Sequence, residues 1–403
     1  MRNLEESLFW EIFYRRQAVR SELAHLFSVS AATISRAAGV LLSKQLIVET
    51  GGTSSSRGRR PAPLRVNSEL AWVAGIEIDR DRITAVITDM AGDLLGRSAI
   101  DADVRNPVKR TLRDCRQTLR KALADAGKRP GQLARIGVGH TGTLDVENGI
   151  CLGWEGMPHW RGVKLLADLR ELLETEVTLD DRARAVALAQ HLLWPENRRH
   201  RSAIYVQVGT GIGAGIFMNG RMLRGATLGG GEIGHMVIDR SGPSCTCGRR
   251  GCVEAFASLG ATISRVRQAL DQDAATSLRA VAGDSSQLTA DMIVSAAREG
   301  DALARSALAE SGEALGIGIA NAVQLLNPSL VVLTGKFANA AGDFFLDTVT
   351  RAIQSQCFET FSRGLQIRMA PFRKDAGPVG CALLASLDVA EGLIERALFL
   401  PTC

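Results

Sequence analysis

Residues 231–258 read GEIGHMVIDRSGPSCTCGRRGCVEAFAS, and this stretch carries the sharpest chemical signal in the chain. His235 is followed by Cys245, Cys247 and Cys252 in a C-x-C-x4-C pattern. One imidazole and three thiolates form a complete tetrahedral ligand set for Zn²⁺, and a site closed by four protein ligands leaves no position for a reactive water. The pattern predicts one structural zinc ion. The alternative is four buried, reduced side chains.

The remaining cysteines and the hydropathy pattern indicate the compartment. Eight cysteines in 403 residues are too few for a disulfide framework, which favours a reducing environment. No uninterrupted apolar run reaches the roughly 18–20 residues of a membrane helix. The first residues, MRNLEESLFWEIFYRR, lack the features of a signal peptide. We therefore expect a cytoplasmic protein with no membrane partner.

The N-terminal residues have the pattern of a helix-turn-helix. Apolar residues at helical spacing predict three short helices, at 3–16, 21–27 and 31–44. Ser21 and Ser30 are the expected N-caps of the second and third helices. Two short helices joined by a tight turn are typical of DNA-binding modules, in which the start of the second helix enters the major groove. Here Thr33, Ser35 and Arg36 would reach bases or phosphates.

A wing follows the predicted third helix. Short strands are expected at 46–50 and 64–67, on either side of the loop GGTSSSRGRRPAP at 51–63. The loop carries Arg57, Arg59 and Arg60, which suit insertion into a narrow minor groove. Residues 1–70 hold ten Lys/Arg and six Asp/Glu, while the whole chain has a net charge of +5. This local excess favours a module that binds DNA. The alternative is a flexible linker with incidental arginines.

From residue 71 the pattern changes to an α/β architecture. Strands are expected at 72–79, 82–89 and 94–100, then a helix at 108–126 and buried strands near 136–139 and 177–179. A similar alternation recurs from YVQVGTGIGAGIFMNGRML to LVVLTGK, which suggests two similar lobes. We expect three domains, namely a winged helix-turn-helix at 1–70, a first lobe at 71–190 and a second lobe with the zinc site at 191–403. The C-terminal helix is free to return to the first lobe.

The segment at 231–258 resembles the signature of the ROK family of repressors, open reading frames and sugar kinases. The family pattern is E-x-G-H followed by C-x-C-G-x-x-G-C-x-E, and the chain matches every position from Glu232 to Glu254. The resemblance covers residues 71–403, and the N-terminal module is similar to that of the family's repressor branch. It implies an α/β fold with two actin-like, ribonuclease H-like lobes.

The resemblance also implies a set of sugar contacts. Carried over from the family's sugar kinases, they are Asp180, Asp181, Glu232, His235 and Glu254. Carboxylates accept hydrogen bonds from vicinal hydroxyls, and a zinc-bound histidine can donate its other ring N–H. In a kinase, Asp181 would be the general base. Without the resemblance, the preferred interpretation of Asp181 is a helix N-cap.

Departures from the kinase pattern predict the loss of catalysis. Kinases of the family begin with D-x-G-G-T-K, whose glycines let the backbone approach ATP phosphates. Here the corresponding residues are Glu77-Ile78-Asp79-Arg80-Asp81-Arg82, which place side chains and carboxylates where phosphates would bind. Arg80 and Arg82 would offset this charge if they turned inward. The kinase Asn-Asp pair has become Asp180-Asp181, and a following asparagine has become Ala183.

These observations predict a sugar-responsive, DNA-binding transcriptional regulator, acting as a repressor and without enzymatic activity. Its expected partners are an operator DNA, a sugar bound between the lobes, and further copies of the chain as a homodimer or dimer of dimers, because one winged helix gives limited affinity. One alternative is an active sugar kinase fused to a DNA-binding module. Another is a regulator controlled by a protein partner.

Overall fold

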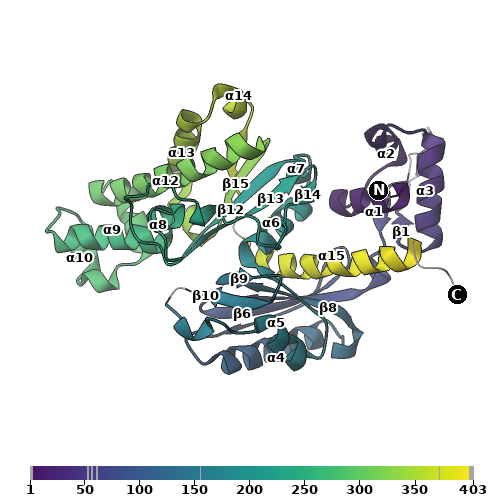
Figure 1. Cartoon of the computed structure of the whole chain (residues 1–403), viewed down its shortest axis with the longest axis horizontal. Coiled ribbons are helices and arrows are strands. Elements are labelled where there is room, and N and C mark those ends of the chain that lie inside the picture. The colour runs from purple at the N-terminus through teal and green to yellow at the C-terminus, as the bar shows by residue number, and fades with distance from the viewer. Residues whose placement is uncertain are drawn as a thin grey trace. The chain divides into compact units, whose positions relative to one another are not determined.

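The computed structural model describes residues 3–51, 54–55, 58–59, 62–154, 156–371 and 373–398, with the backbone alone for 54–55, 58–59 and Ala282. The chain divides into two compact units, and Figure 1 follows the chain through both. The first unit runs to Arg198 and resumes at Asp375, and the second runs from Arg199 to Lys374. The boundary expected at residue 190 therefore falls inside helix α6 (Arg182–Leu193).

The first unit opens with three helices, α1 (Leu4–Arg15), α2 (Arg20–Phe27) and α3 (Ala31–Ser43). Helices α2 and α3 meet at a bend of 114°, which is the geometry of a helix-turn-helix. The Ser30 hydroxyl accepts a hydrogen bond from the Thr33 amide and caps α3 as expected. The expected cap of α2 is wrong, since α2 begins at Arg20 after Val19, which makes no side-chain capping bond.

The wing strands pair as the sequence predicts. β1 (Ile47–Glu49) is antiparallel to β4 (Leu64–Val66), with Ile47 opposite Val66. Between them, β2 (Ser54–Ser55) pairs with β3 (Gly58–Arg59). Arg57 and Arg60 lie outside the described residues, and for Arg59 only the backbone is described.

After η1 (Ser68–Leu70), the first unit contains a five-stranded sheet in the order β11-β8-β5-β6-β7. Strands β5, β6 and β7 are antiparallel neighbours, while β8 and β11 add parallel to β5. The strand bounds are β5 Trp72–Ile78, β6 Arg82–Asp89, β7 Leu94–Asp101, β8 Leu133–His140 and β11 Val177–Asp181. The small hairpin of β9 (Thr143–Asp145) and β10 (Ile150–Gly153) lies outside this sheet.

Helices cover both faces of this sheet. The even positions of β5, such as Ile76, share a core with Leu112 and Cys115 of α4 (Val108–Asp125). The odd position Gly75 lies against α15 (Ala376–Leu398), where a Cβ would stand 1.9 Å from the Pro378 carbonyl oxygen. The other helices of the unit are η2 Pro130–Gln132, η3 Pro158–Trp160, α5 Leu165–Leu173 and α7 Pro195–Arg198.

The second unit repeats the topology, with a sheet in the order β14-β13-β12-β15-β16. Its strands are β12 Ala203–Val208, β13 Ile212–Met218, β14 Arg221–Met222, β15 Leu330–Thr334 and β16 Gln366–Met369. Its helices are η4 Ile233–His235, α8 Val253–Ala257, α9 Leu259–Asp271, α10 Leu278–Ala282, η5 Ser285–Gln287, α11 Ala290–Arg298, α12 Ala302–Leu326, α13 Lys336–Gln356 and α14 Glu359–Ser362. Each sheet has three antiparallel strands extended by two parallel ones, which confirms the predicted duplication.

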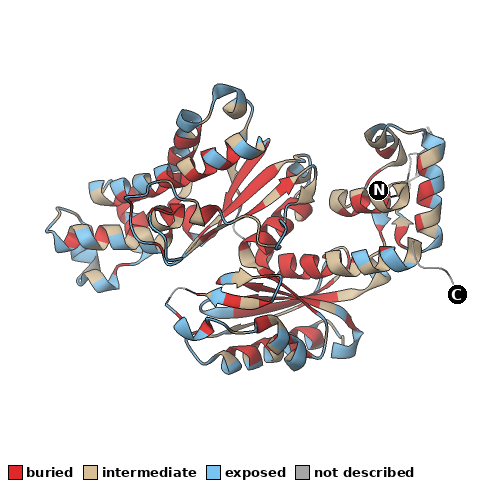
Figure 2. Cartoon of the chain, viewed as in Figure 1, coloured by how far each residue is buried: buried red, intermediate tan, exposed pale blue. Residues whose placement is uncertain are grey.

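The C-terminal helix α15 returns to the first unit. Among the described residues it is the single helix long and apolar enough to span a membrane, and α2 with α3 passes the same test as a bent pair. In the most apolar 18-residue stretch of α15, 72% is buried within the protein. Figure 2 shows the buried colour along much of the helix. The apolar character of α15 is explained by its packing on the sheet.

Candidate functional site

The four predicted metal ligands lie together in the second unit. His235 ends η4, Cys245 and Cys247 lie in the following loop, and Cys252 immediately precedes α8. Their ligand atoms all lie within 4.8 Å of one another. Cys245 Sγ is 3.6 Å from His235 Nδ1, and Cys247 Sγ is 3.7 Å from Cys252 Sγ. The cluster has the composition and compactness of a metal site.

These distances fit a tetrahedral ion. Zn–S bonds of about 2.3 Å and Zn–N bonds of about 2.0–2.1 Å give S···S separations of about 3.8 Å and S···N separations of about 3.6 Å at tetrahedral angles. Although burial opposes it, hydrogen bonds from Arg249 lower the pKa of the Cys247 thiol to about 6. The thiolate form, which binds metals, is therefore accessible near neutral pH.

The backbone of the loop is shaped around the cluster. The Gly248 amide donates to the Cys245 carbonyl oxygen at 3.0 Å, and the Cys245 amide donates to the Arg249 carbonyl oxygen at 2.7 Å. Gly251 has φ +72°, and a Cβ there would stand 1.4 Å from the Asp239 carbonyl oxygen. A side chain at this position is incompatible with the loop, so glycine is required where the chain turns back toward Cys252.

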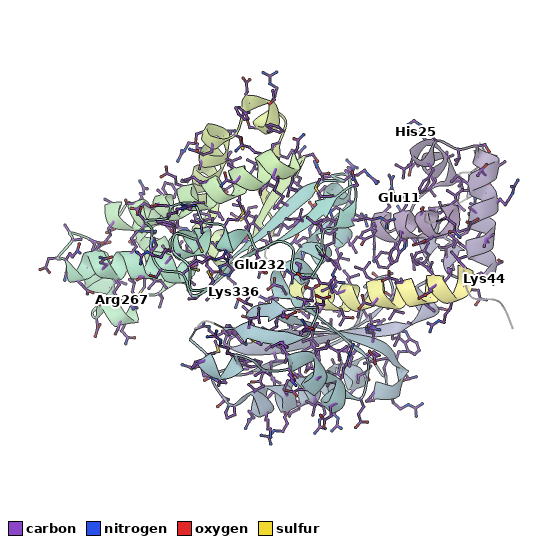
Figure 3. The ribbon with its side chains drawn as sticks, viewed as in Figure 1. Glu11, His25, Lys44, Glu232, Arg267 and Lys336 are labelled. Carbon is purple, nitrogen blue, oxygen red and sulfur yellow. The ribbon has the colours of Figure 1, made fainter. Side chains whose placement is uncertain are left out.

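Two predicted sugar ligands flank the metal cluster in the sequence. Glu232 occupies the N-cap position of η4, and Figure 3 labels it. Glu254 lies on α8, two residues after Cys252, and its Oε2 accepts a hydrogen bond of 2.8 Å from the Ile212 amide. A metal held by His235 and Cys252 would fix the short elements that carry both carboxylates.

The predicted pair Asp180 and Asp181 lies in the first unit, where β11 ends and α6 begins. Asp180 is fully buried, and its Oδ1 accepts hydrogen bonds from Arg184 Nε at 2.6 Å and the Asp181 amide at 2.7 Å. Asp181 is the N-cap of α6, because its Oδ1 accepts from the Ala183 amide at 2.7 Å. The N-cap interpretation of Asp181 is confirmed, and Asp180, expected as a sugar contact, instead pairs with Arg184 and anchors the segment that presents Asp181.

Arg182 is a residue whose role the sequence reasoning missed. Its Nε donates to Glu77, at the end of β5, and its Nη2 lies 3.5 Å from Asp79 Oδ2. Its side chain is 18% exposed. The charges of Glu77 and Asp79 are thus partly offset from α6. By contrast, Arg80 and Arg82 are exposed, and Arg82 lies 3.6 Å from Asp101 on β7.

Two backbone amides of the turn between β5 and β6 are bonded within the turn. The Asp79 amide donates to the Arg82 carbonyl oxygen, and the Arg80 amide donates to Asp79 Oδ1, each at 2.9 Å. In the corresponding turn between β12 and β13, the Gly209 amide donates to the Gly211 carbonyl oxygen, and Ile212 donates to Glu254 as described. Free N–H groups are what a phosphate-binding loop offers, so neither turn presents these amides to a nucleotide.

The start of α3 offers a small, polar surface. Ala31, Ala32, Ser35 and Arg36 are exposed, while Ile34 is buried in the module. The Thr33 hydroxyl lies 2.8 Å from the Ser30 hydroxyl at the N-cap. Small residues permit close approach to base edges, and Ser35 and Arg36 can donate hydrogen bonds to them.

Comparisons with known proteins agree with this geometry. A model of the ROK family matches residues 73–387. The xylose repressor of Caldicellulosiruptor bescii is 29% identical over 371 residues, which covers 92% of each chain. A crystal structure of a ROK family transcriptional regulator, a homologue of the E. coli MLC protein, matches with a TM-score of 0.71 and 26% identity over 94% of both chains.

The chain is also similar to enzymes. The glucokinase of Thermotoga maritima is 27% identical over 308 residues, which covers 76% of this chain and 95% of the glucokinase. Similarity to repressors thus extends over more of the chain than similarity to the kinase.

Proposed function

The chain belongs to the ROK family, and from this premise we propose that it is a sugar-responsive transcriptional repressor without kinase activity. The observation that carries the proposal is the combination of a helix-turn-helix with a β5–β6 turn that places Asp79 and Asp81 where the family's kinases have a glycine and a threonine. Relatives named as repressors match along 92% or more of the chain. The protein would act in the cytoplasm on an operator, as a homodimer or dimer of dimers, because paired half-sites supply the affinity that one module lacks.

We propose Zn²⁺ as the ion of the His/Cys cluster and a sugar as the effector. The proposed sugar contacts are Asp181, Glu232, His235 and Glu254. With Nδ1 on the metal, His235 has its Nε2–H available to donate to a sugar hydroxyl. The zinc ion itself is structural, since its four protein ligands leave no open coordination position.

The coupling between sugar and DNA requires two states of different affinity. A sugar shifts the protein toward whichever state binds it more tightly, by no more than its differential affinity. A hundred-fold preference corresponds to about 2.7 kcal/mol, enough to release or promote operator binding. Sugar binding therefore needs selectivity between states more than high affinity.

Replacing Asp181 with asparagine is expected to abolish the sugar response. Asparagine retains the N-cap of α6 but removes the charged acceptor of hydroxyl protons. A panel of monosaccharides, amino sugars and sugar phosphates is first screened by thermal shift with the wild-type protein. The variant should keep the wild-type melting temperature and ligand-free DNA affinity while losing the shift. Asp181→Ala is the matched comparison, because it should lose both the sugar and about 0.5–2 kcal/mol of capping stability.

An unchanged sugar response in Asp181→Asn would contradict the proposed contact. A protein whose DNA binding responds to no sugar in the panel would favour control by a protein partner instead.

Sugar-dependent ATP hydrolysis is expected to be undetectable in a coupled assay. Phosphoryl transfer depends on positioning and charge stabilisation of the γ-phosphate, and here carboxylates and internally bonded amides stand at both turns. The double variant Asp79→Gly and Asp81→Gly tests this reason. It removes both carboxylates and frees the Arg80 amide, so its affinity for ATP should exceed that of the wild type. Turnover by the wild-type protein would establish the alternative of an active kinase fused to a DNA-binding module.

A further inference from the structure

The outer face of α4 carries an unusual density of positive charge. The helix reads VKRTLRDCRQTLRKALAD from Val108 to Asp125. We define its basic face as Lys109, Arg110, Arg113, Arg116, Arg120 and Lys121. Of these residues, Arg116 is partly buried and the others are exposed, and Figure 2 shows the exposed colour on the outer side of this helix. The acidic residues of α4 are Asp114 and Asp125.

This arrangement is unfavourable for the helix by itself. Lys109 and Arg110 lie in the first turn, where the helix dipole favours negative charge, and the N-cap position is Pro107, without a side-chain cap. Side chains three or four residues apart are neighbours on a helix surface, so Arg116 lies beside both Arg113 and Arg120, which carry the same charge. Each such pair destabilises a helix by about 0.2–0.5 kcal/mol. A bound polyanion would reverse the sign of these terms.

Few carboxylates offset this charge within the part of the chain that the structure describes. Asp114 lies 3.3 Å from Arg110, and Asp125 accepts a hydrogen bond from the Arg97 amide. Arg113 donates to the Lys109 carbonyl oxygen. Among the described residues, Arg113, Arg116 and Arg120 form no ion pair.

The same face lacks the anchors of a protein interface or of a membrane helix. The apolar side chains of α4, such as Leu112, Leu119 and Leu123, are buried against the sheet. Arginine is common at protein interfaces, but their affinity depends on anchors that fill packed, desolvated pockets, and a membrane-surface helix buries an apolar face in the lipid. The basic face of α4 includes no aromatic or aliphatic side chain for either purpose. The remaining chemistry on this face is electrostatic, and it matches a phosphate backbone.

We propose that the basic face of α4 is a second, sequence-independent contact surface for DNA, separate from the helix-turn-helix. From Lys109 to Lys121 the face extends about 18 Å along the helix axis. Duplex DNA presents roughly ten phosphates over that length. Arginines bind phosphates through paired N–H donors. The surface would hold flanking or second-segment DNA without reading its sequence, which goes beyond the proposed function.

The experiment measures the salt dependence of binding to a random-sequence 40-base-pair duplex, with the full chain. In the test variant, Arg113, Arg116 and Arg120 are all replaced by glutamine, which retains helix propensity. If the three arginines neutralise three phosphates, the slope of log affinity against log salt should become shallower by about 2.7. Replacing the same three residues by lysine should preserve the wild-type slope.

The matched control replaces Arg298, Arg351 and Arg363 by glutamine. Of these exposed arginines, Arg298 lies on α11, Arg351 on α13 and Arg363 directly after α14 in the second unit. The control therefore has the same change in net charge at other positions. Its slope should equal that of the wild type. Equal slopes in the test variant and the wild type would overturn the proposal, as would equal losses in test and control variants.

Two further arms separate the other interpretations. Arg36→Gln, measured on an operator duplex selected by the wild-type protein, tests the helix-turn-helix independently, so an effect at Arg36 with none at α4 overturns this inference and leaves the proposed function standing. An effect at α4 with none at Arg36 supports this inference and contradicts the proposed role of the helix-turn-helix. Vesicles containing phosphatidylserine test the membrane, and α4-dependent binding to vesicles with an unchanged DNA slope would overturn the proposal in favour of a lipid surface.

Discussion

Replacing Cys247 with serine is expected to reduce bound zinc from one ion per chain to none and to lower the melting temperature of the second unit by on the order of 10 °C. A ligand present at a thousand times its Kd stabilises the folded state by about 4 kcal/mol. For a unit of this size, each kcal/mol corresponds to about 2–4 °C. Elemental analysis and thermal unfolding of freshly purified protein measure both quantities.

The matched control is Cys357→Ser, because Cys357 is a partly buried cysteine of the same unit whose Sγ lies 3.6 Å from the Ala320 carbonyl oxygen. It lies outside the cluster and should retain the metal. A wild-type protein free of zinc, or a Cys247→Ser variant with wild-type metal content and melting temperature, would contradict the site.

The loss of metal should also remove the sugar response, for a reason that the local structure supplies. Cys252 is the N-cap residue of α8, and His235 ends η4, which follows Glu232. The Glu254 carboxylate on α8 in turn bonds the Ile212 amide of the β12–β13 turn. Without the ion, the elements that carry Glu232 and Glu254 are no longer held in place. Sugar binding must then order both carboxylates, and this entropic cost lowers the affinity for the sugar.

The metal ligands could be predicted from the sequence because they fall within a short stretch whose residue types leave few other interpretations. The duplicated fold could be predicted because alternation within strands and Gly-rich turns are local properties. The register of β5 with β8 and β6, and the way α15 returns to the sheet, depend on pairings between distant residues. Local patterns carry no direct signal for such pairings.

The ion pairs around Asp181 show the same limit. Asp180 on β11 pairs with Arg184 in the first turn of α6, only four residues later, so this contact is local in the sequence. Arg182 instead pairs with Glu77, which is distant in sequence, and this contact depends on β5 and α6 being brought together by the sheet. The sequence suggests Arg80 and Arg82 as the cations that offset this charge, because they are neighbours of the acidic residues along the chain. A contact with a distant residue such as Arg182 cannot be located without the fold.

The structure describes the predicted DNA contacts on α3 but not the side chains of the wing arginines. The exposure of Ser35 and Arg36 follows from the helical period, since the buried Ile34, Ala37 and Ala38 face the module. Arg57 and Arg60 lie outside the described residues, and Arg59 is described by its backbone alone. They stay predictions, together with the groove that each would enter.

Replacing Arg36 with alanine is expected to weaken operator binding by about 1–3 kcal/mol, or roughly five- to 150-fold, if the side chain reads a base. Specificity at one operator position should relax at the same time. Deleting residues 1–67 should abolish the preference for the selected duplex over random sequence, while leaving a body that retains zinc and the sugar-induced thermal shift. Anisotropy titrations with a duplex selected from random sequences by the wild-type protein measure each affinity.

Lys44 provides the matched control on the same helix. It follows Ser43 at the C-terminal end of α3, where Figure 3 labels it, about 12 Å along the axis from Arg36. Lys44→Ala removes the same charge, so it should reduce affinity only through the salt-dependent term and equally for all sequences. Equal, sequence-independent losses at both positions would show that α3 contacts the backbone without reading bases, and undiminished binding by the deleted chain would remove the helix-turn-helix from DNA recognition.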